Sequence, residues 1–260
     1  MSAKQIPFRD ATGRKKRIEI LFEDESLIAV NKPSGMPVIP DRWDDRLPNL
    51  RDLLERYYQK ITETAEQAIW VVHRIDADTS GIILFARTAE MHRALNTMFE
   101  AQEIDKTYLA LTAGGLKEKS GVISLPIRRH PKRRQYMQVN VNGKSSETHF
   151  QIAEEFRQYC LVELVPKTGR THQIRVHLAA LNCPLAIDPL YGSSAPISLE
   201  NIKPRFRKNN AEKESALMQR LTLHAAKLSF QDPITNARRI FEAPLPKDFA
   251  ALLKALRKWG

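Results

Sequence analysis

A polar turn enclosed by two apolar segments is the feature of this sequence that most limits its fold. Within residues 71–86, the turn holds His73, Arg74 and Asp76, and the apolar run 82–86 follows it. Such a run is typical of a buried strand. Because an unpaired charge is costly to bury, charged residues between buried segments need a partner or a function. We therefore predict that Asp76 is a catalytic carboxylate; capping of the turn is its alternative role.

The charge balance points to a polyanionic partner. The chain has 260 residues, which predicts a single domain, with room for two lobes. Its hydrophobic share of 42% and charged share of 27% are ordinary for a globular protein, but its formal net charge is +11. This excess favours nucleic acid over a membrane as the partner, with a merely basic protein as the alternative.

The N-terminal residues 1–17 are polar and end in the basic run 14–17, which predicts a mobile basic arm, with a solvated tail of no function as the alternative. They contain no signal-peptide core, and no apolar run is long enough to cross a membrane, so we expect a cytoplasmic protein without a membrane partner. Two cysteines, Cys160 and Cys183, suggest neither a disulfide framework nor a zinc site. The seven histidines show no metal-ligand spacing and no glycine-rich phosphate loop is present. We predict neither a metal nor a nucleotide cofactor.

Apolar periodicity predicts strands alternating with a few amphipathic helices. One helix is expected after an N-cap at Thr88, and another after an N-cap at Thr171. In the strand 106–112, alternation places Tyr108 on the face opposite Thr107 and Leu109. Residues 193–220 read as a long basic loop or insertion. The remaining expected elements are a hairpin of 18–22 and 27–30, strands 121–125, 135–141, 147–153, 159–165, 221–230 and 240–241, and helices 50–59 and 246–259.

Two loops concentrate positive charge. Residues 128–134 contain five fixed cations in seven positions, among them Arg133 and Arg134, and Pro131 interrupts the run. A phosphate-contacting loop is favoured here over a merely solvated one. In residues 203–208, cations surround Phe206, which is compatible with RNA contact, although a solvated loop is the favoured interpretation.

Six short motifs in order resemble those of the RluA-type RNA pseudouridine synthases. The segment His73–Gly81 resembles the family's H-R-L-D-x-x-T-S-G motif, with Ile75 in place of leucine. The resemblance spans roughly residues 18–250. The other five motifs are found at residues 31–35 (N-K-P-S-G), 106–110 (K-x-Y-x-A), 168–178 (T-G-R-T-H-Q-I-R-V-H-L), 188–192 (D-P-L-Y-G) and 223–225 (L-H-A).

This resemblance implies a role for each matching residue. Asp76 is similar to the nucleophile that attacks ribose C1′ or, in another proposal, C6 of the base. Arg175 is similar to the arginine that pairs with this aspartate, although by itself it reads as a helix-surface cation. Tyr108 is similar to the tyrosine that stacks on the target base, and a core position is its alternative. Arg74 is similar to the arginine that fills the gap left by the flipped base.

The resemblance also implies the fold and the partner. We expect the arm 1–17 to precede one catalytic domain, 18–260, of mixed α/β (α+β) class, with a largely antiparallel bent sheet flanked by helices. The arm is too short for the S4 domain that many relatives carry. Lys167, Arg170 and His172 are expected to face phosphate near a helix N-terminus, and His73 to shape the turn.

The predicted function is isomerisation of uridine to pseudouridine in structured RNA, either 23S-type rRNA or tRNA, by a monomer without cofactor. Two alternatives remain open. One is a non-catalytic RNA-binding module on the same fold. The other is a glycosylase, which would release free uracil.

Overall fold

The computed structural model describes residues 4–10, 13–40, 48–62, 68–203 and 216–260. The chain divides into two compact units. Unit 1 comprises Met1–Lys106 and Ala225–Pro244, and unit 2 comprises Thr107–His224 and Leu245–Gly260. Most neighbouring strands pair antiparallel in both units. The predicted mixed α/β fold with a largely antiparallel sheet and few helices is confirmed.

Unit 1 is built on a sheet whose strand order is β1-β2-β3-β5-β12, with β4 paired to β5 and β13 paired to β12. The predicted hairpin at residues 18–30 is present as β2 and β3. Most of β12 lies in this unit. The strands are β1 (Gln5–Arg9), β2 (Lys15–Glu23), β3 (Leu27–Lys32), β4 (Trp70–Val71), β5 (Ser80–Ala86), β12 (Leu223–Gln231) and β13 (Arg238–Glu242), and the helices are α1 (Leu50–Thr62) and α2 (Ala89–Glu100).

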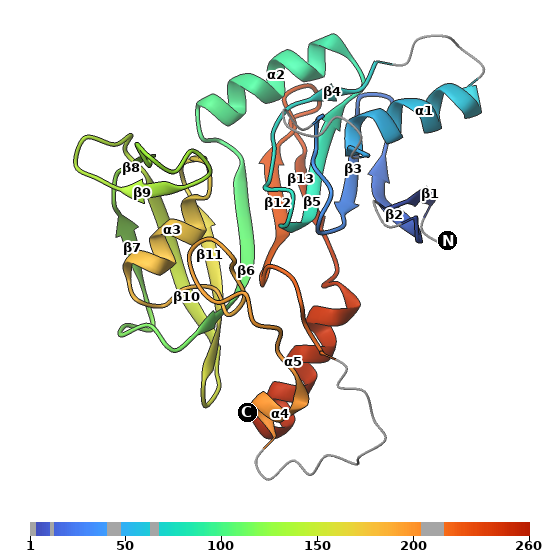
Figure 1. The fold of residues 1–260 in the computed structure, drawn as a ribbon. Helices are drawn as coiled ribbons and strands as arrows, with labels where there is room; N and C mark the ends of the chain where they lie inside the picture. The colour runs from blue at the N-terminus through green and yellow to red at the C-terminus, as the bar shows by residue number, and fades with distance from the viewer. Residues whose placement is uncertain (1–3, 11–12, 41–47, 63–67, 204–215) are drawn as a thin grey trace. The chain divides into compact units, whose positions relative to one another are not determined.

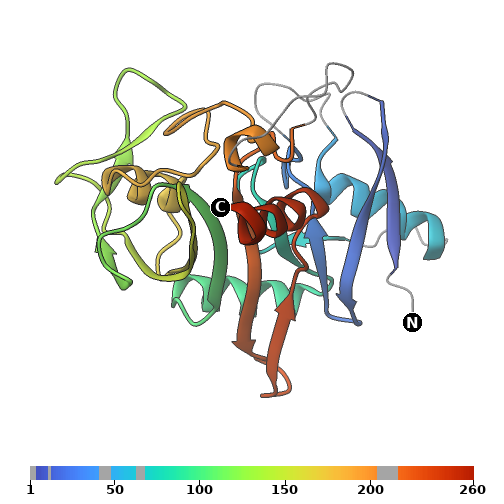
Figure 2. The same ribbon diagram turned by 90° about the horizontal axis from the view of Figure 1, so that it is seen from below.

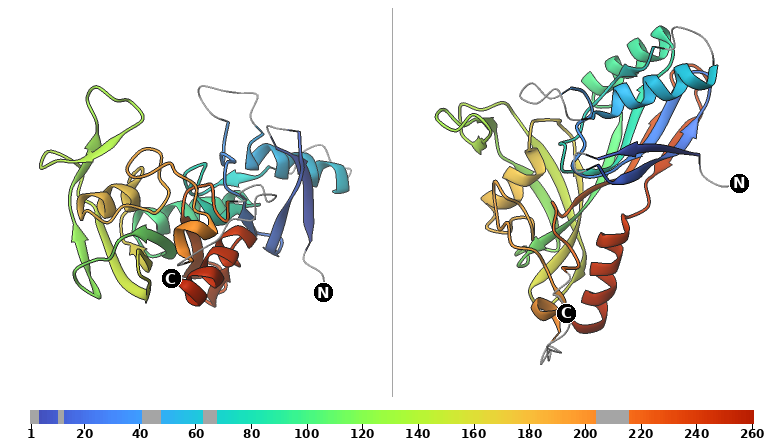
Figure 3. Two further views of the ribbon diagram at one scale, coloured as in Figure 1. Left: turned by 60° about the horizontal axis from the view of Figure 1, so that its bottom comes forward. Right: turned by 45° about the vertical axis from the view of Figure 1, so that its right-hand side comes forward.

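The prediction of a mobile N-terminal arm is wrong for the residues that the structure describes there. Strand β1 pairs with the first half of β2, with Ile6 opposite Ile18 and Phe8 opposite Lys16 (Figure 3). Both isoleucines are buried in the core of unit 1, and this burial holds the basic segment in the sheet.

Strand β5 is the centre of the unit 1 core, because all seven of its residues are buried. On one face, Ile83 and Phe85 pack in a cluster with Leu50 and Leu54 of α1 (Figure 1). Helix α2 packs against β5 and β4, and Thr88 caps its N-terminus by accepting the Met91 N–H, as predicted. The turn that holds Asp76 therefore leads directly into the most buried strand of its unit.

The described part of unit 2 contains a sheet of strand order β6-β11-β10-β7, a separate β8–β9 hairpin and three helices. Leu109 and Tyr108 belong to different core clusters, so the predicted alternation along β6 is confirmed. Helix α3 contributes to the Tyr108 cluster and α5 to the other (Figures 1 and 2). The bounds are β6 (Asp105–Ala113), β7 (Ser120–Ser124), β8 (Ile127–Arg129), β9 (Met137–Val139), β10 (Glu147–Glu155), β11 (Tyr159–Pro166), α3 (Gln173–Ala180), α4 (Leu199–Ile202) and α5 (Lys247–Trp259).

The start of α3 and the segment 193–220 differ from what the sequence predicts. Thr171 is not the N-cap of α3, because His172 occupies that position with a left-handed φ of 54° and makes no side-chain cap. The expected loop at 193–220 contains the short helix α4, and most of its basic segment 203–208 lies outside the described residues. In the described ranges, no helix is long and apolar enough to cross a membrane.

The start of β5 imposes a tight backbone approach. Gly81 has φ +116°, and a methyl group on it would overlap the backbone carbonyl of Ala225. We predict that Gly81→Ala lowers the free energy of unfolding by about 3 kcal/mol or more, because it adds backbone strain and a clash in a packed region. Urea denaturation measures the loss.

The matched control is Gly115→Ala. This glycine has open space around it and no positive φ. Its substitution should change stability by less than about 1 kcal/mol. Equal stability of the two variants would contradict the prediction.

Candidate functional site

The Asp76 turn is held against the loop that follows β3. The Gly35 N–H donates to the carbonyl of Ala77 at 2.9 Å, and the Ser34 hydroxyl donates to that of Asp78 at 2.6 Å. The Thr79 N–H closes the turn on the Asp76 carbonyl at 3.1 Å. The predicted motifs 31–35 and 73–81 are therefore one structural feature. The side chain of Asp76 itself is half-buried.

A buried lysine joins the Asp76 turn to the loop that follows β3. Lys32 is fully buried, and its ammonium donates to the carbonyl oxygens of Pro33 at 3.0 Å, Met36 at 2.8 Å and Ala77 at 2.7 Å. A buried charge is tolerable only when its polar atoms have partners. Both loops must therefore keep the conformation that directs these carbonyls at one point. No role was predicted for Lys32, because it follows the polar Asn31 at the end of β3, where a lysine is unremarkable.

His73 joins the Asp76 turn to strand β5. Its Nε2 accepts the backbone N–H of Leu84 in β5 at 2.9 Å, and its ring stacks on Phe99 with 4.7 Å between centroids. Burial, and secondarily the charge of Lys106, lower the pKa of His73 to about 3. The ring is therefore neutral near pH 7 and keeps its acceptor. Arg74, next in the chain, is exposed.

In unit 2, Arg175 forms a buried, two-pronged ion pair with Asp188. Its Nε donates to Asp188 Oδ2 at 2.8 Å and its Nη2 to Oδ1 at 2.7 Å, while the side chains are only 4% and 0% exposed. The carboxylate also accepts the N–H groups of Leu190 and Tyr191. Arg175 is thus not the helix-surface cation that its local sequence suggested. The sequence motif containing Asp188 was identified, but only the tertiary structure shows that Asp188 pairs with Arg175.

Tyr191 connects Arg175 to its surroundings. The guanidinium of Arg175 lies 5.1 Å from the centre of the Tyr191 ring. The Tyr191 hydroxyl accepts the N–H of Met137 in β9 at 2.8 Å and lies 2.8 Å from His172 Nδ1. Through one side chain, the β8–β9 hairpin, the start of α3 and Arg175 are joined.

The turn before α3 is fixed by Gln173, which is buried. Its Oε1 accepts the Thr168 hydroxyl and the Arg170 N–H, and its Nε2 donates to the carbonyl of Glu147 and the hydroxyl of Thr148. All four hydrogen-bonding positions of the amide are used. This arrangement holds Lys167, Arg170 and His172 at the N-terminal end of α3, where we predicted them.

Of the predicted basic loop 128–134, residues 128 and 129 belong to strand β8, and residues 130–134 lie in the tip of the β8–β9 hairpin. Arg133 and Arg134 are exposed, and the Arg133 guanidinium lies 5.3 Å from the centre of the Tyr136 ring. His130 Nδ1 accepts the N–H groups of Lys132 and Arg133, so the tip has a defined conformation. An ordered cluster of exposed cations is suited to phosphate binding.

The predicted catalytic residues are divided between the units. Asp76 belongs to unit 1, whereas Tyr108 and Arg175 belong to unit 2. Tyr108 is half-buried on β6 and packs against the cluster that contains Ile174 and Leu178 of α3. The pairing of Asp76 with Arg175 remains a prediction.

Comparison with known proteins supplies the family. Residues 26–180 match the model of a family described as RNA pseudouridylate synthase. The chain is 37% identical over 242 residues to ribosomal large subunit pseudouridine synthase D of Nitrosomonas europaea, covering 92% of this chain and 65% of that protein. It is 36% identical over 244 residues to the protein of the same name from Blochmanniella floridana, covering 93% and 74%.

A solved structure shares the fold. The human RNA pseudouridylate synthase domain containing 4 superimposes with a TM-score of 0.69 at 24% identity, covering 92% of both chains. The family predicted from the six motifs is confirmed. The chain belongs to the RNA pseudouridine synthases, the enzymes that isomerise uridine in RNA to pseudouridine.

Proposed function

We propose that this protein forms pseudouridine in large-subunit rRNA, with Asp76 as the nucleophile. The names of the curated relatives support large-subunit rRNA rather than tRNA as the substrate. The observation that carries the proposed site is the rigid mounting of Asp76, on a turn tied to β3 by Lys32 and to β5 by His73. A fixed carboxylate is what nucleophilic attack at a buried sugar carbon requires.

The proposed reaction begins with base flipping. The target uridine leaves the RNA stack at a cost of a few kcal/mol, and the exposed Arg74 fills the gap. Asp76 then attacks C1′, or alternatively C6, and the glycosidic bond breaks. The uracil turns while it is detached, C5 forms the new bond to C1′, and the bond between the Asp76 carboxylate and the nucleotide breaks, which frees the carboxylate. Loss of the C5 proton completes the isomerisation, so no redox partner is needed.

Tyr108 and Arg175 are proposed to complete the site. Tyr108 stacks on the target base, which contributes about 1–3 kcal/mol. Arg175 pairs with Asp76, and its bidentate contact with Asp188 together with the Tyr191 ring fixes the direction of the guanidinium. Because these residues belong to two units, their joint action rests on the family resemblance rather than on a distance.

RNA binding beyond the target nucleotide is assigned to Lys167, Arg170, His172, Arg133 and Arg134. Lys167, Arg170 and His172 sit at or before the N-terminus of α3, where helix N–H groups favour anions. Arg133 and Arg134 lie in the β8–β9 tip. We further propose that the enzyme acts as a monomer in the cytoplasm.

The decisive test replaces the nucleophile. We expect Asp76→Asn to reduce pseudouridine formation at least about a thousandfold, because the amide cannot attack, while RNA affinity changes less than about threefold. Carbodiimide mapping of rRNA and tRNA treated with the pure protein measures the product and shows which RNA is modified. Activity of Asp76→Asn near the wild-type level would refute the proposed mechanism.

Asp78→Asn is the matched control. Asp78 lies in the same turn, is exposed, and accepts the Ser34 hydroxyl through its backbone carbonyl, which the substitution leaves in place. It should retain near-normal activity. Free uracil from the wild-type protein would instead indicate a glycosylase, and RNA binding without either product would indicate a binding module.

The β8–β9 tip generates a separate prediction. Arg133→Gln with Arg134→Gln should weaken RNA binding and reduce the slope of log Kd against log salt by about 1.5, since two phosphate contacts are lost. Fluorescence anisotropy at several KCl concentrations measures this slope. An unchanged slope would remove the tip from the RNA interface.

A further inference from the structure

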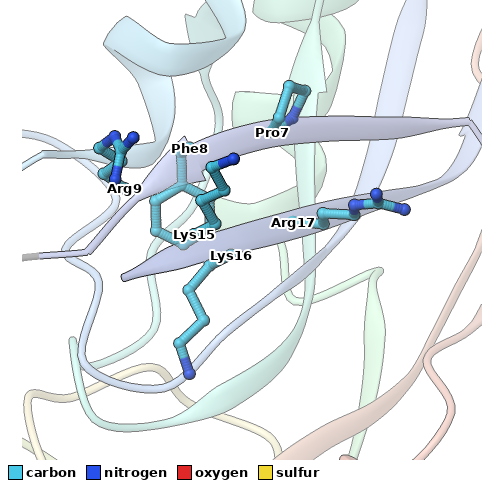
Figure 4. A pocket seen from close by; sticks show the side chains of 6 residues that line it. All are labelled: Pro7, Phe8, Arg9, Lys15, Lys16 and Arg17. Atoms are coloured by element: carbon cyan, nitrogen blue, oxygen red, sulfur yellow. The ribbon is translucent and has the colours of Figure 1, made fainter. Parts of the chain in front are cut away.

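The β1–β2 hairpin carries a cluster of cations that has no role in the proposed catalytic site. A surface hollow of about 460 Å³ is lined by Pro7, Phe8, Arg9, Lys15, Lys16 and Arg17 (Figure 4). Four of these six side chains are positively charged. We propose that the hairpin is a second RNA-docking surface, which binds backbone phosphates of nucleotides next to the target uridine. This inference rests on the proposed function, because it takes RNA as the partner.

The pairing register distributes the cations over the hairpin. Arg9 lies opposite Lys15, and Pro7 lies opposite Arg17, on the outward face. Phe8 and Lys16 form the next pair on the face that buries Ile6 and Ile18. Figure 4 shows Lys15 and Lys16 pointing to opposite sides of the ribbon. All four cations are exposed, so their charges are open to a ligand.

Within the described residues, hydrogen bonds orient the two arginines and neither of them forms an ion pair. Arg9 donates to the carbonyl of Gly13 at 2.8 Å, and Arg17 donates to the side-chain oxygen of Gln5 at 3.0 Å. Both acceptors are uncharged, so each guanidinium keeps its full charge and several donors. A guanidinium held in this way is suited to phosphate oxygens.

Protection of a sheet edge is the alternative explanation of charge on an outer strand. It accounts poorly for this hairpin. The edge strand is β1, and it contributes only Arg9 to the cluster. The other three cations lie on β2, whose edge is already covered by β1. Charge on a covered strand does nothing to block strand addition, so a ligand explains it better.

The same register places the hairpin at the catalytic end of the unit 1 sheet. Glu19, Asn31 and Ile82 form one row across β2, β3 and β5. Strands β2 and β5 run in the same direction. Followed from this row toward the N-terminus, β2 reaches Lys15 and β5 reaches the Asp76 turn, so both lie toward the same end of the sheet. Two strand spacings, roughly 10 Å, separate β2 from β5. An RNA whose target uridine lies at Asp76 therefore needs only a few nucleotides to reach the hairpin.

The test compares two double variants of equal charge. Lys15→Gln with Arg17→Gln removes two cations of the cluster, and Lys247→Gln with Lys254→Gln removes two exposed cations of α5. Each protein is titrated with a fluorescently labelled stem-loop RNA at several KCl concentrations. The hairpin variant should lower the salt slope of log Kd by about 1.5. The α5 control should leave it nearly unchanged.

Single-turnover pseudouridine formation at saturating enzyme should stay within about twofold of wild type in both variants, because the hairpin binds but does not react. Equal salt slopes for the hairpin and α5 variants would overturn the inference. That result is distinct from failure of the proposed function, which would appear as absence of pseudouridine from the wild-type protein. Circular dichroism of both variants verifies that they are folded.

Discussion

The buried ammonium of Lys32 is the interaction on which the candidate site depends. It donates hydrogen bonds to backbone carbonyl oxygens of two loops. One of these oxygens belongs to Ala77, the residue after Asp76. Removing a charge from water is costly, and the cost is offset only while every donor has a well-placed acceptor. Any movement of the Asp76 turn away from β3 would break this arrangement. The position of the proposed nucleophile is thereby coupled to the core of unit 1.

Unit 2 applies the same physical principle with different residues. Arg175 is nearly buried and is held by Asp188, and the Gln173 amide satisfies four groups of the preceding turn. Satisfied polar networks in the interior specify one geometry, because each alternative leaves a polar group without a partner. Exposed side chains such as that of Arg170, for which we propose RNA binding, are then held on a rigid backbone. In both units, the order of the site comes from polar groups beneath the surface.

Most of the fold was predictable, because most of its elements have a local signal. The buried run of β5, the cap at Thr88 and the alternation along β6 were read from short-range patterns. The β1–β2 hairpin was not, because its charges and Pro7 conceal a weak alternation. Only the burial of Ile6 in the core makes this segment a strand. The N-cap at His172 was also missed, since His172 has a left-handed backbone conformation and makes no side-chain cap that a sequence pattern would indicate.

The sequence by itself identified the family and predicted which groups react. Six motifs indicated the family, and the resemblance predicted the carboxylate of Asp76 as the nucleophile. Only the tertiary structure decided what supports these groups. The ammonium of Lys32 meets the carbonyl of Ala77 across 45 positions of sequence, and Arg175 finds Asp188 through the fold around α3. Spacing along a chain specifies periodic local structure, whereas hydrogen-bond partners of buried polar groups are selected by packing, which brings distant segments together.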